Sequence, residues 1–332
     1  MPKRTRIVIG GVDTHGRSHH VAVIDEHGRL LGDREFPANT SGYRQLLGWL
    51  RRHGQLRAVG VEGTSSYGAG LAQVLVDQQV TVLEVSRPDR RARRQRGKSD
   101  PIDAEAAARA VLAGTATAIP KRRDGIVAAI QTLRTTRGGA IKARTAAINQ
   151  LKGLLVTAPA PIREALEGHS TAALVTACAR LRPDAARLAE PSQATKAALQ
   201  ALAKRIQALE AELASADERL SKLVATAAPR TMALFAIGID HAGQLLVTAG
   251  EHPERLRGEA AFAHLCGSAP IPASSGKTRR HRLHRGGDRA ANRALHLAVV
   301  VRLRWCERTR TYAARRTAEG LSTPEIMRCF IG

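Results

Sequence analysis

The chain has 332 residues, of which 43% are hydrophobic, and its 52 Lys and Arg residues against 29 acids give a formal net charge of +23 at pH 7. This length suffices for two domains of about 100 to 200 residues each, and positive charge spread along the whole chain favours a polyanionic partner. No run approaches the roughly 18 apolar residues of a membrane-spanning helix, and no signal-peptide pattern follows Met1. We therefore expect a soluble, cytoplasmic protein. Aromatic residues make up only 3%, which argues against recognition of single strands mainly by base stacking.

Strand and helix patterns alternate along the first part of the chain, which we expect to be a domain of residues 1–114. β-branched or alternating apolar runs predict strands, and apolar residues at helical spacing predict helices. The order βββαβαβα predicts a mixed sheet with helices packed on it, an α/β fold. The expected segments are strands at 6–12, 19–25 and 29–36, a helix at 41–53, a strand at 57–61, a helix at 63–78, a strand at 80–85 and a helix at 101–112.

Four acids occur where this pattern would bring them together. Asp13 closes the first strand and Glu62 closes the fourth, and the C-terminal ends of strands are where α/β proteins commonly bind ligands. Asp100 and Asp103 are three residues apart, so they share one face of a helix. Converging carboxylates need a compensating cation, and hard oxygen ligands suit Mg²⁺ or Mn²⁺. Two such ions about 4 Å apart would bind the attacking and leaving oxygens of a phosphoryl transfer.

Each acid also has an ordinary structural explanation. Asp100 before Pro101 is typical of a helix N-cap with proline at the first helical position, and Asp103 would be a favourable acid in the first turn. Asp13 and Glu62 both precede turn residues. Only the four acids together, on matching elements, favour a metal site.

A strongly basic segment, residues 87–98, comes directly before the last two acids and holds seven basic residues against one acid. A solvated charge run is the usual interpretation of such a segment. Because a polyanion held here would pass its backbone across the acids, we expect phosphate contacts that add affinity rather than base specificity. The contacts are expected from Arg90, Arg91, Arg93, Arg94, Arg96 and Lys98.

Residues 115–229 are predicted to be a helical connector. Apolar residues recur at helical spacing from Ile126 to Leu155 without a proline, which predicts a long helix. From Leu199 to Leu223 they alternate three and four apart over more than three heptads, as in a coiled coil. This second helix could pack within its own subunit, but its narrow stripe favours self-association of the chain.

Residues 230–332 are predicted to form a mainly α C-terminal domain. Leu234–Val247 has the pattern of two helices joined by a Gly-containing turn, which could present backbone N–H groups to a phosphate, although any helical hairpin uses such a turn. Glu259–Leu265 predicts a short helix. A longer helix is predicted at Arg289–Arg304, and its apolar residues are expected to support the serine-containing stretch before it: Leu295, Leu297, Val299 and Val301.

Between these two helices, Ser274 and Ser275 precede Gly276 and a basic run. A serine hydroxyl is a poor nucleophile at neutral pH and needs a base, a metal or positive charge nearby. We interpret the stretch as a place where a hydroxyl meets a phosphodiester, and a serine on a turn beside glycine, Ser275, is the better exposed of the two. Nucleic-acid contacts are expected from Lys277, Arg279, Arg280, Arg282, Arg285 and Arg289.

Several segments together resemble the transposases of insertion sequence family 110: GVDTH, VGVEGTSSYG, KSDPIDAEAAARA and GSAPIPASSGKTRRHRLHRGGDRAANRALHLAVVVRLR. In that family an acidic DEDD quartet lies on a RuvC-like, RNase H-type domain, and a C-terminal serine attacks the DNA backbone together with the DEDD site of a partner subunit. The serine falls on Ser275 when counted forward from GSAP, and Ser274 also fits when counted backward from RLHRGGD. Carried over by motif, the quartet is Asp13, Glu62, Asp100 and Asp103.

The resemblance implies a DNA transposase or recombinase guided by a structured bridge RNA, which pairs with donor and target DNA. It implies a phosphoserine intermediate assisted by Mg²⁺ (or Mn²⁺), in a prokaryotic cytoplasm with nucleoid association on DNA. Four strand cleavages predict a homo-oligomer, a dimer that assembles to a tetramer. Two alternatives stay open: a metal-dependent junction resolvase or nuclease without the serine step, and a non-enzymatic basic nucleic-acid-binding protein. We expect relatives to continue helically beyond Phe330, which predicts a shortened C-terminus.

Overall fold

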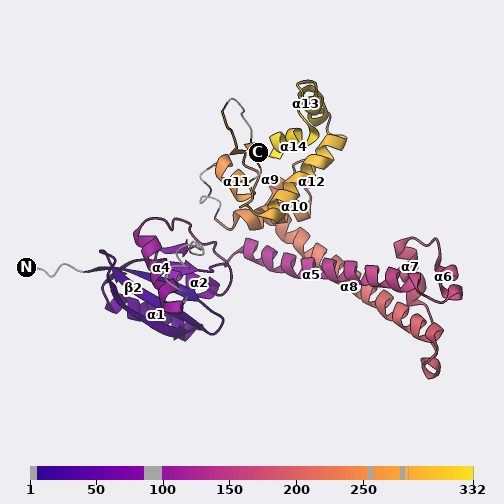
Figure 1. Ribbon diagram of the computed structural model, residues 1–332, viewed down its shortest axis with the longest axis horizontal. Coiled ribbons are helices and arrows are strands. Elements are labelled where there is room, and N and C mark those ends of the chain that lie inside the picture. The colour runs from indigo at the N-terminus through magenta and orange to yellow at the C-terminus, as the bar shows by residue number, and fades with distance from the viewer. Residues whose placement is uncertain are drawn as a thin grey trace, which may run out of the picture. The chain divides into compact units, whose positions relative to one another are not determined.

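The computed structural model describes residues 6–85, 99–252, 256, 258–276, 281–282 and 284–331 (Figure 1). The chain divides into two compact units, which are treated separately: Met1–Gly125 with Gly250–Arg255, and Ile126–Ala249 with Leu256–Gly332. The predicted boundaries after residues 114 and 229 stay a prediction. Within the described ranges no helix has the length and apolarity needed to cross a membrane.

The first unit contains a five-stranded mixed sheet in the order β3-β2-β1-β4-β5. β1 is antiparallel to β2, and β2 to β3, whereas β4 is parallel to both β1 and β5. This is the α/β sheet that the pattern of strands and helices predicts, in the predicted order. The elements are β1 (Ile7–Thr14), β2 (Ser18–Asp25), β3 (Leu30–Pro37), α1 (Thr40–Arg52), β4 (Gln55–Glu62), α2 (Ala69–Asp77), β5 (Val82–Val85) and α4 (Asp100–Leu112).

The two faces of the sheet are covered by different helices. On one face, alternating valines of the central strands pack against Leu46 and Leu50 of α1 and Leu71 and Leu75 of α2. On the other face, α4 packs against the sheet through small residues such as Ala108. Because side chains alternate between the faces of a strand, successive residues of β1 contribute to two separate cores.

The helix predicted from Gly63 begins six residues later, at Ala69. Gly63 has a positive φ of 64°, and residues 63–68 form turns in which the Ser66 and Gly68 N–H groups both donate to the Gly63 carbonyl. A left-handed glycine ends β4 sharply, so the chain turns before the helix can start.

The second unit is built on a helical hairpin of α5 (Ile126–Val156) and α8 (Pro191–Ala227), which lie side by side in Figure 1. The long helices are confirmed, but the stripe of α8 is buried within the same chain. Its first part packs with Leu151 near the end of α5, and Leu220 packs with Ile130 near the start. A coiled coil between copies through this stripe is therefore not supported, because α5 already covers it. The connection contains α6 (Ala160–Leu166), α7 (Thr171–Ala179) and η1 (Ala185–Arg187).

The remainder of the second unit is mainly helical, as predicted, with a small β-hairpin. Leu234 and Phe235 lie in exposed turns rather than in the predicted first helix, and Ala236 has a positive φ of 73°. In α12 the predicted apolar residues divide: Val299 is buried, whereas Leu297 and Val301 are each 38% exposed. The support expected from this helix stays a prediction. The elements are α9 (Pro229–Met232), α10 (Ile239–Ala249), α11 (Glu259–Leu265), β6 (Ile271–Pro272), β7 (His281–Arg282), α12 (Arg289–Trp305), α13 (Glu307–Ala318) and α14 (Thr323–Ile331).

Candidate active site

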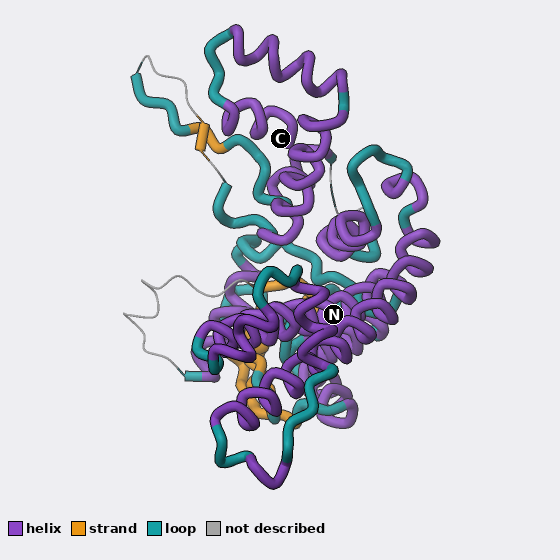
Figure 2. Tube along the Cα trace, turned by 90° about the vertical axis from the view of Figure 1, so that its right-hand side faces the viewer, coloured by secondary structure: helices purple, strands orange, loops and turns teal. Residues whose placement is uncertain are grey.

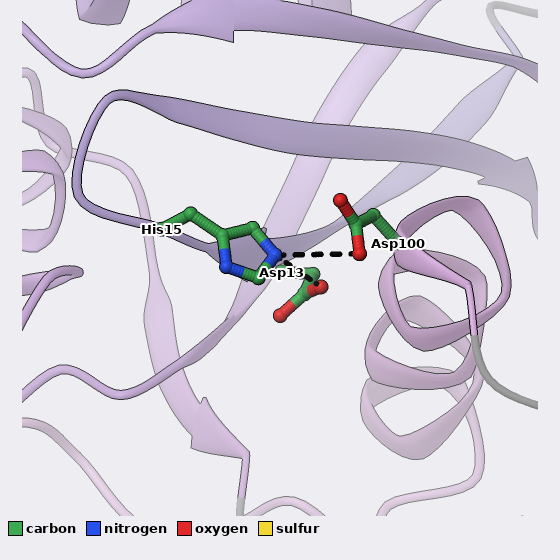
Figure 3. A group of neighbouring side chains, drawn as sticks. All are labelled: Asp13, His15 and Asp100. Carbon is green, nitrogen blue, oxygen red and sulfur yellow. Dashed lines mark hydrogen bonds and ion pairs between the residues drawn. The ribbon is translucent and has the colours of Figure 1, made fainter.

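The structure brings Asp13 and Asp100 together around a histidine (Figure 3). Asp13 is the last residue but one of β1 and is 8% exposed. Nε2 of His15, in the turn after β1, lies 3.1 Å from Asp13 Oδ2 and 3.4 Å from Asp100 Oδ1. The predicted approach of a strand-end acid to the first turn of the helix is present, with an imidazole between them.

Two glycines allow α4 to approach the sheet closely enough to deliver its acids. A Cβ on Gly11 of β1 would lie 2.1 Å from the Ala104 carbonyl oxygen and 2.2 Å from the Ala108 nitrogen. A Cβ on Gly60 of β4 would lie 2.8 Å from the carbonyl oxygen of Ala107. The alanine-rich face of the helix therefore rests directly on strand backbone, and this contact holds the N-terminus of α4 beside Asp13.

The other two predicted acids lie next to this group. Val12 pairs with Val61 in the parallel ladder, so Asp13 and Glu62 follow at neighbouring positions of β1 and β4. The hydroxyl of Thr14 donates to the Glu62 carbonyl oxygen at 2.9 Å, which ties the two strand ends together. Asp103 is buried on α4, at 5% exposure. Its negative charge raises the pKa of Asp13.

The electrostatic environment of Asp13 favours a bound cation. Burial raises the pKa of the Asp13 carboxyl above its ordinary 3.8; His15 opposes the rise, and the charges of Asp100 and Asp103 add to it. Burial and like charges both disfavour an ionised carboxylate. A divalent cation bound here would offset both the burial and the repulsion between the carboxylates. The residues present therefore fit a divalent metal ion.

The capping explanation does not account for Asp100. The N-cap of α4 is Ser99, and Asp100 is the first helical residue, with Pro101 after it. The Asp100 carboxylate instead pairs with His15, which lies in the turn after β1 and not on α4. Asp103 does lie in the first turn, where an acid interacts favourably with the helix dipole, so its position is compatible with both explanations.

Among the residues that the structure describes, Asp13, His15 and Asp100 form a group whose ligand atoms all lie within 4.8 Å of one another. Glu62 and Asp103 are not members of that group. Sequence reasoning missed His15, although the GVDTH segment placed it two residues after the strand-end acid. On the tight connection between β1 and β2, this spacing returns the side chain toward the strand end.

The two candidate serines lie in the second unit, on the connection between β6 and β7. These two short strands are the small orange segment at the upper left of Figure 2. Ser274 and Ser275 are both exposed, and the following Gly276 has a positive φ of 55°. The turn beside glycine is therefore as predicted. Exposure alone does not separate the two hydroxyls, so the preference for Ser275 stays a prediction.

Part of the predicted basic surface adjoins this hairpin. Arg282 and Arg285 line a cavity of about 490 Å³ together with Ile271 and His284, and Arg289, the first residue of α12, is exposed. The remaining predicted contacts lie outside the described residues: Arg90, Arg91, Arg93, Arg94, Arg96, Lys98, Lys277, Arg279 and Arg280.

Asp288, the one acid in the basic stretch, has a structural role that sequence reasoning missed. Its Oδ1 accepts from the Ala290 and Ala291 N–H groups at 2.8 and 3.3 Å, which caps α12. Its Oδ2 accepts from the hydroxyl of Thr248, a buried residue of α10, at 2.7 Å. One carboxylate thus fixes the helix that follows the serine hairpin to the body of the unit.

Comparison with known proteins places both units in one family. Residues 10–158 match the model of the DEDD transposases of IS110, described as "Transposase", and residues 228–314 match the model "Transposase IS116/IS110/IS902 family". A mini-circle transposase for IS117 from Streptomyces coelicolor is 30% identical over 155 residues, which are 45% of this chain and 37% of that protein. The match to the first model identifies the mixed sheet with α4 as the RNase H-like DEDD domain. With the two models matched in chain order over more than half of its length, the chain belongs to the IS110 family of transposases.

Proposed function

We propose that this protein is a DNA transposase that cuts and rejoins donor and target DNA through a phosphoserine intermediate, guided by a structured bridge RNA and assisted by divalent metal at the DEDD site. The observation that carries the proposal is the cluster at the end of β1, where Asp13, His15 and Asp100 lie within 4.8 Å of one another, with Glu62 and Asp103 adjacent. Carboxylates gathered in this way are the ligands of phosphoryl-transfer sites.

The acids would hold Mg²⁺ or Mn²⁺, which when bound supplies Lewis-acid stabilisation of a phosphodiester oxygen. The chain itself contributes the geometry. Asp13 is fixed by β1, and the close contact of α4 with Gly11 fixes Asp100 and Asp103. Since His15 and Asp100 are about half exposed, a DNA backbone could reach the carboxylates from solvent.

The serine step would involve Ser275, with Ser274 as the alternative. In this step the hydroxyl loses its proton and its oxygen bonds to phosphorus, while the bond from phosphorus to the deoxyribose oxygen breaks and that oxygen takes up a proton. Rejoining reverses these changes with a different DNA end. Arg282 of β7 and Arg285, three residues later, would stabilise the negative charge that develops on the phosphoryl oxygens.

The partners of the proposed reaction are polyanions. A net charge of +23 supports binding to bridge RNA and to both DNA duplexes, with affinity that falls steeply as salt rises. Exchange of two duplexes needs four strand cleavages, so we propose a homo-oligomer, a dimer that assembles to a tetramer. Since α5 covers the stripe of α8, the surfaces that join the copies would lie elsewhere.

One experiment separates this function from that of a metal-dependent junction resolvase, which the pre-assembled acid cluster also supports. RNA that co-purifies with the protein is sequenced, and labelled DNA duplexes complementary to its loops serve as substrates. The proposal predicts that Ser275→Ala and Asp13→Asn both abolish strand cleavage. Cleavage that survives Ser275→Ala and Ser274→Ala singly and together, but not Asp13→Asn, would favour the resolvase.

A further inference from the structure

The geometry points to His15 as a metal ligand, which makes the site of the proposed function a mixed nitrogen and oxygen site that prefers Mn²⁺ to Mg²⁺. The inference rests on the proposed metal-dependent function and adds a residue outside the acidic quartet. It starts from the position of one atom: Nε2 of His15 lies between the carboxylates of Asp13 and Asp100 rather than pointing away from them (Figure 3).

The distances suit three ligands of one ion. Neighbouring ligands of an octahedral ion stand at right angles, so with bonds of about 2.1 Å their atoms are about 3.0 Å apart, and opposite ligands are about 4.2 Å apart. Nε2 of His15 lies 3.1 Å from the Asp13 oxygen and 3.4 Å from the Asp100 oxygen. All three ligand atoms lie within 4.8 Å of one another. An ion could therefore bind to this face of the group with only small side-chain movements.

The backbone holds His15 in place. Its N–H donates to the Ser18 carbonyl oxygen at 3.1 Å, across the short connection between β1 and β2. The residues on both sides of this connection are held by the pairing of β1 with β2, in which Asp13 pairs with His20 and Thr14 with His19. A ligand on such a tight connection is positioned before metal binds, which lowers the entropic cost of binding.

The partial exposure of Asp13, His15 and Asp100 suits a metal site that keeps coordination positions open. The side chain of Asp13 is 11% exposed, whereas those of His15 and Asp100 are 46% and 52% exposed. One wall of the site is therefore buried and the other faces solvent. Three protein ligands on one side leave the remaining coordination positions for water or for phosphodiester oxygens, as in catalytic sites.

A nitrogen ligand changes which metal binds best. Mg²⁺ is a hard cation that takes oxygen ligands and keeps several waters. Imidazole is a ligand of transition metals, and Mn²⁺ accepts carboxylate oxygens as Mg²⁺ does while belonging to that series. A site with one imidazole and several carboxylates should therefore bind Mn²⁺ more tightly than Mg²⁺, and removal of the imidazole should reduce this preference.

The test is pulsed electron paramagnetic resonance on the full chain loaded with Mn²⁺ alone, with ¹⁵N-labelled histidine to mark the ligand. The inference predicts a directly coordinated histidine nitrogen in the parent protein, absent in His15→Gln and retained in His20→Ala. His20 is a matched control because it pairs with Asp33 at 2.7 Å, outside the cluster. The His15→Gln variant should also bind Mn²⁺ at least tenfold more weakly, the lower end of what loss of an outer-shell partner costs, and lose less affinity for Mg²⁺.

The outcomes distinguish failure of the His15 ligand from failure of the metal-dependent function on which it rests. Bound Mn²⁺ without a histidine nitrogen, or with a nitrogen signal that persists in His15→Gln, would overturn the role of His15. If the same Mn²⁺ were released by Asp13→Asn, the metal site of the proposed function would stand. Failure of the parent protein to bind Mn²⁺ at all would overturn both. A circular dichroism spectrum identical to that of the parent shows that a variant is folded.

Discussion

The contact between α4 and the sheet predicts that Gly11→Ala damages the site without touching an acid. A Cβ at this position would lie 2.1 Å from the Ala104 carbonyl oxygen, and ordinary contact begins at 3.4 Å. Helix and strand must therefore separate locally by about 1.3 Å, and both partners are backbone. Overpacking of this kind costs about 1–3 kcal/mol, which exceeds the roughly 0.4–1 kcal/mol that replacing glycine gains through the unfolded chain. We expect a net loss of stability of about 1–2 kcal/mol.

The same displacement carries Asp100 and Asp103 away from Asp13, so the variant should also bind Mn²⁺ more weakly. Gly10→Ala is a matched control on the adjacent residue of β1. Its Cβ would meet Leu50 at 3.0 Å and Val59 at 3.3 Å, which are side-chain atoms on the opposite face of the sheet. Denaturant unfolding and Mn²⁺ titration of both variants are the assays. Equal metal affinity in the parent, Gly11→Ala and Gly10→Ala proteins would show that this contact does not position the acids.

Three further predictions concern the framework. Asp288→Ala removes the cap of α12 and the partner of the Thr248 hydroxyl, and thermal unfolding should show a loss of about 1–2 kcal/mol that Asp288→Asn largely avoids; equal losses would contradict the cap. Burial alone would raise the pKa of Asp25, but hydrogen bonds from Arg29 and the His27 N–H outweigh it and lower the pKa to about 2. A lowered pKa stabilises the fold above the ordinary 3.8, and this contribution is lost as pH falls toward 2, so Asp25→Asn should flatten the acid-unfolding curve in that window; an unchanged slope would count against it. Ile206→Ala, in the buried stripe of α8, should cost about 2–5 kcal/mol at unchanged oligomeric mass in sedimentation velocity, whereas dissociation without destabilisation would show that the stripe holds a second copy.

The N-terminal fold follows closely from local sequence signals. Period-two alternation and turn residues placed all five strands of the first unit, and strand ends placed Asp13 and Glu62 at neighbouring positions of one sheet edge. These features depend on residues close together in the chain. His15 was missed for the opposite reason, since its partner Asp100 lies 85 positions later and a histidine after a strand has no characteristic pattern of its own.

The C-terminal part shows what such signals leave open. A heptad stripe indicates that a helix has a partner, but not whether the partner is the same chain, and α5 was long enough to cover it. In α12, which packs against α10, three alanines are buried together with Val299, while Leu297 and Val301 are partly exposed. Asp288 caps α12 through N–H groups two and three residues later in the chain, whereas its bond to Thr248 of another helix has no local signal in the sequence.

A covalent serine step is tested most directly by trapping the protein–DNA adduct and mapping the residue that carries the DNA. The full chain with its co-purified RNA and Mn²⁺ is incubated with a matching labelled duplex, denatured and digested, and the modified peptide is sequenced by mass spectrometry. We expect a nucleotide attached to Ser275 within the β6–β7 connection, absent in Ser275→Ala and in Asp13→Asn. DNA cleaved to completion with no attached peptide at any time point would contradict it.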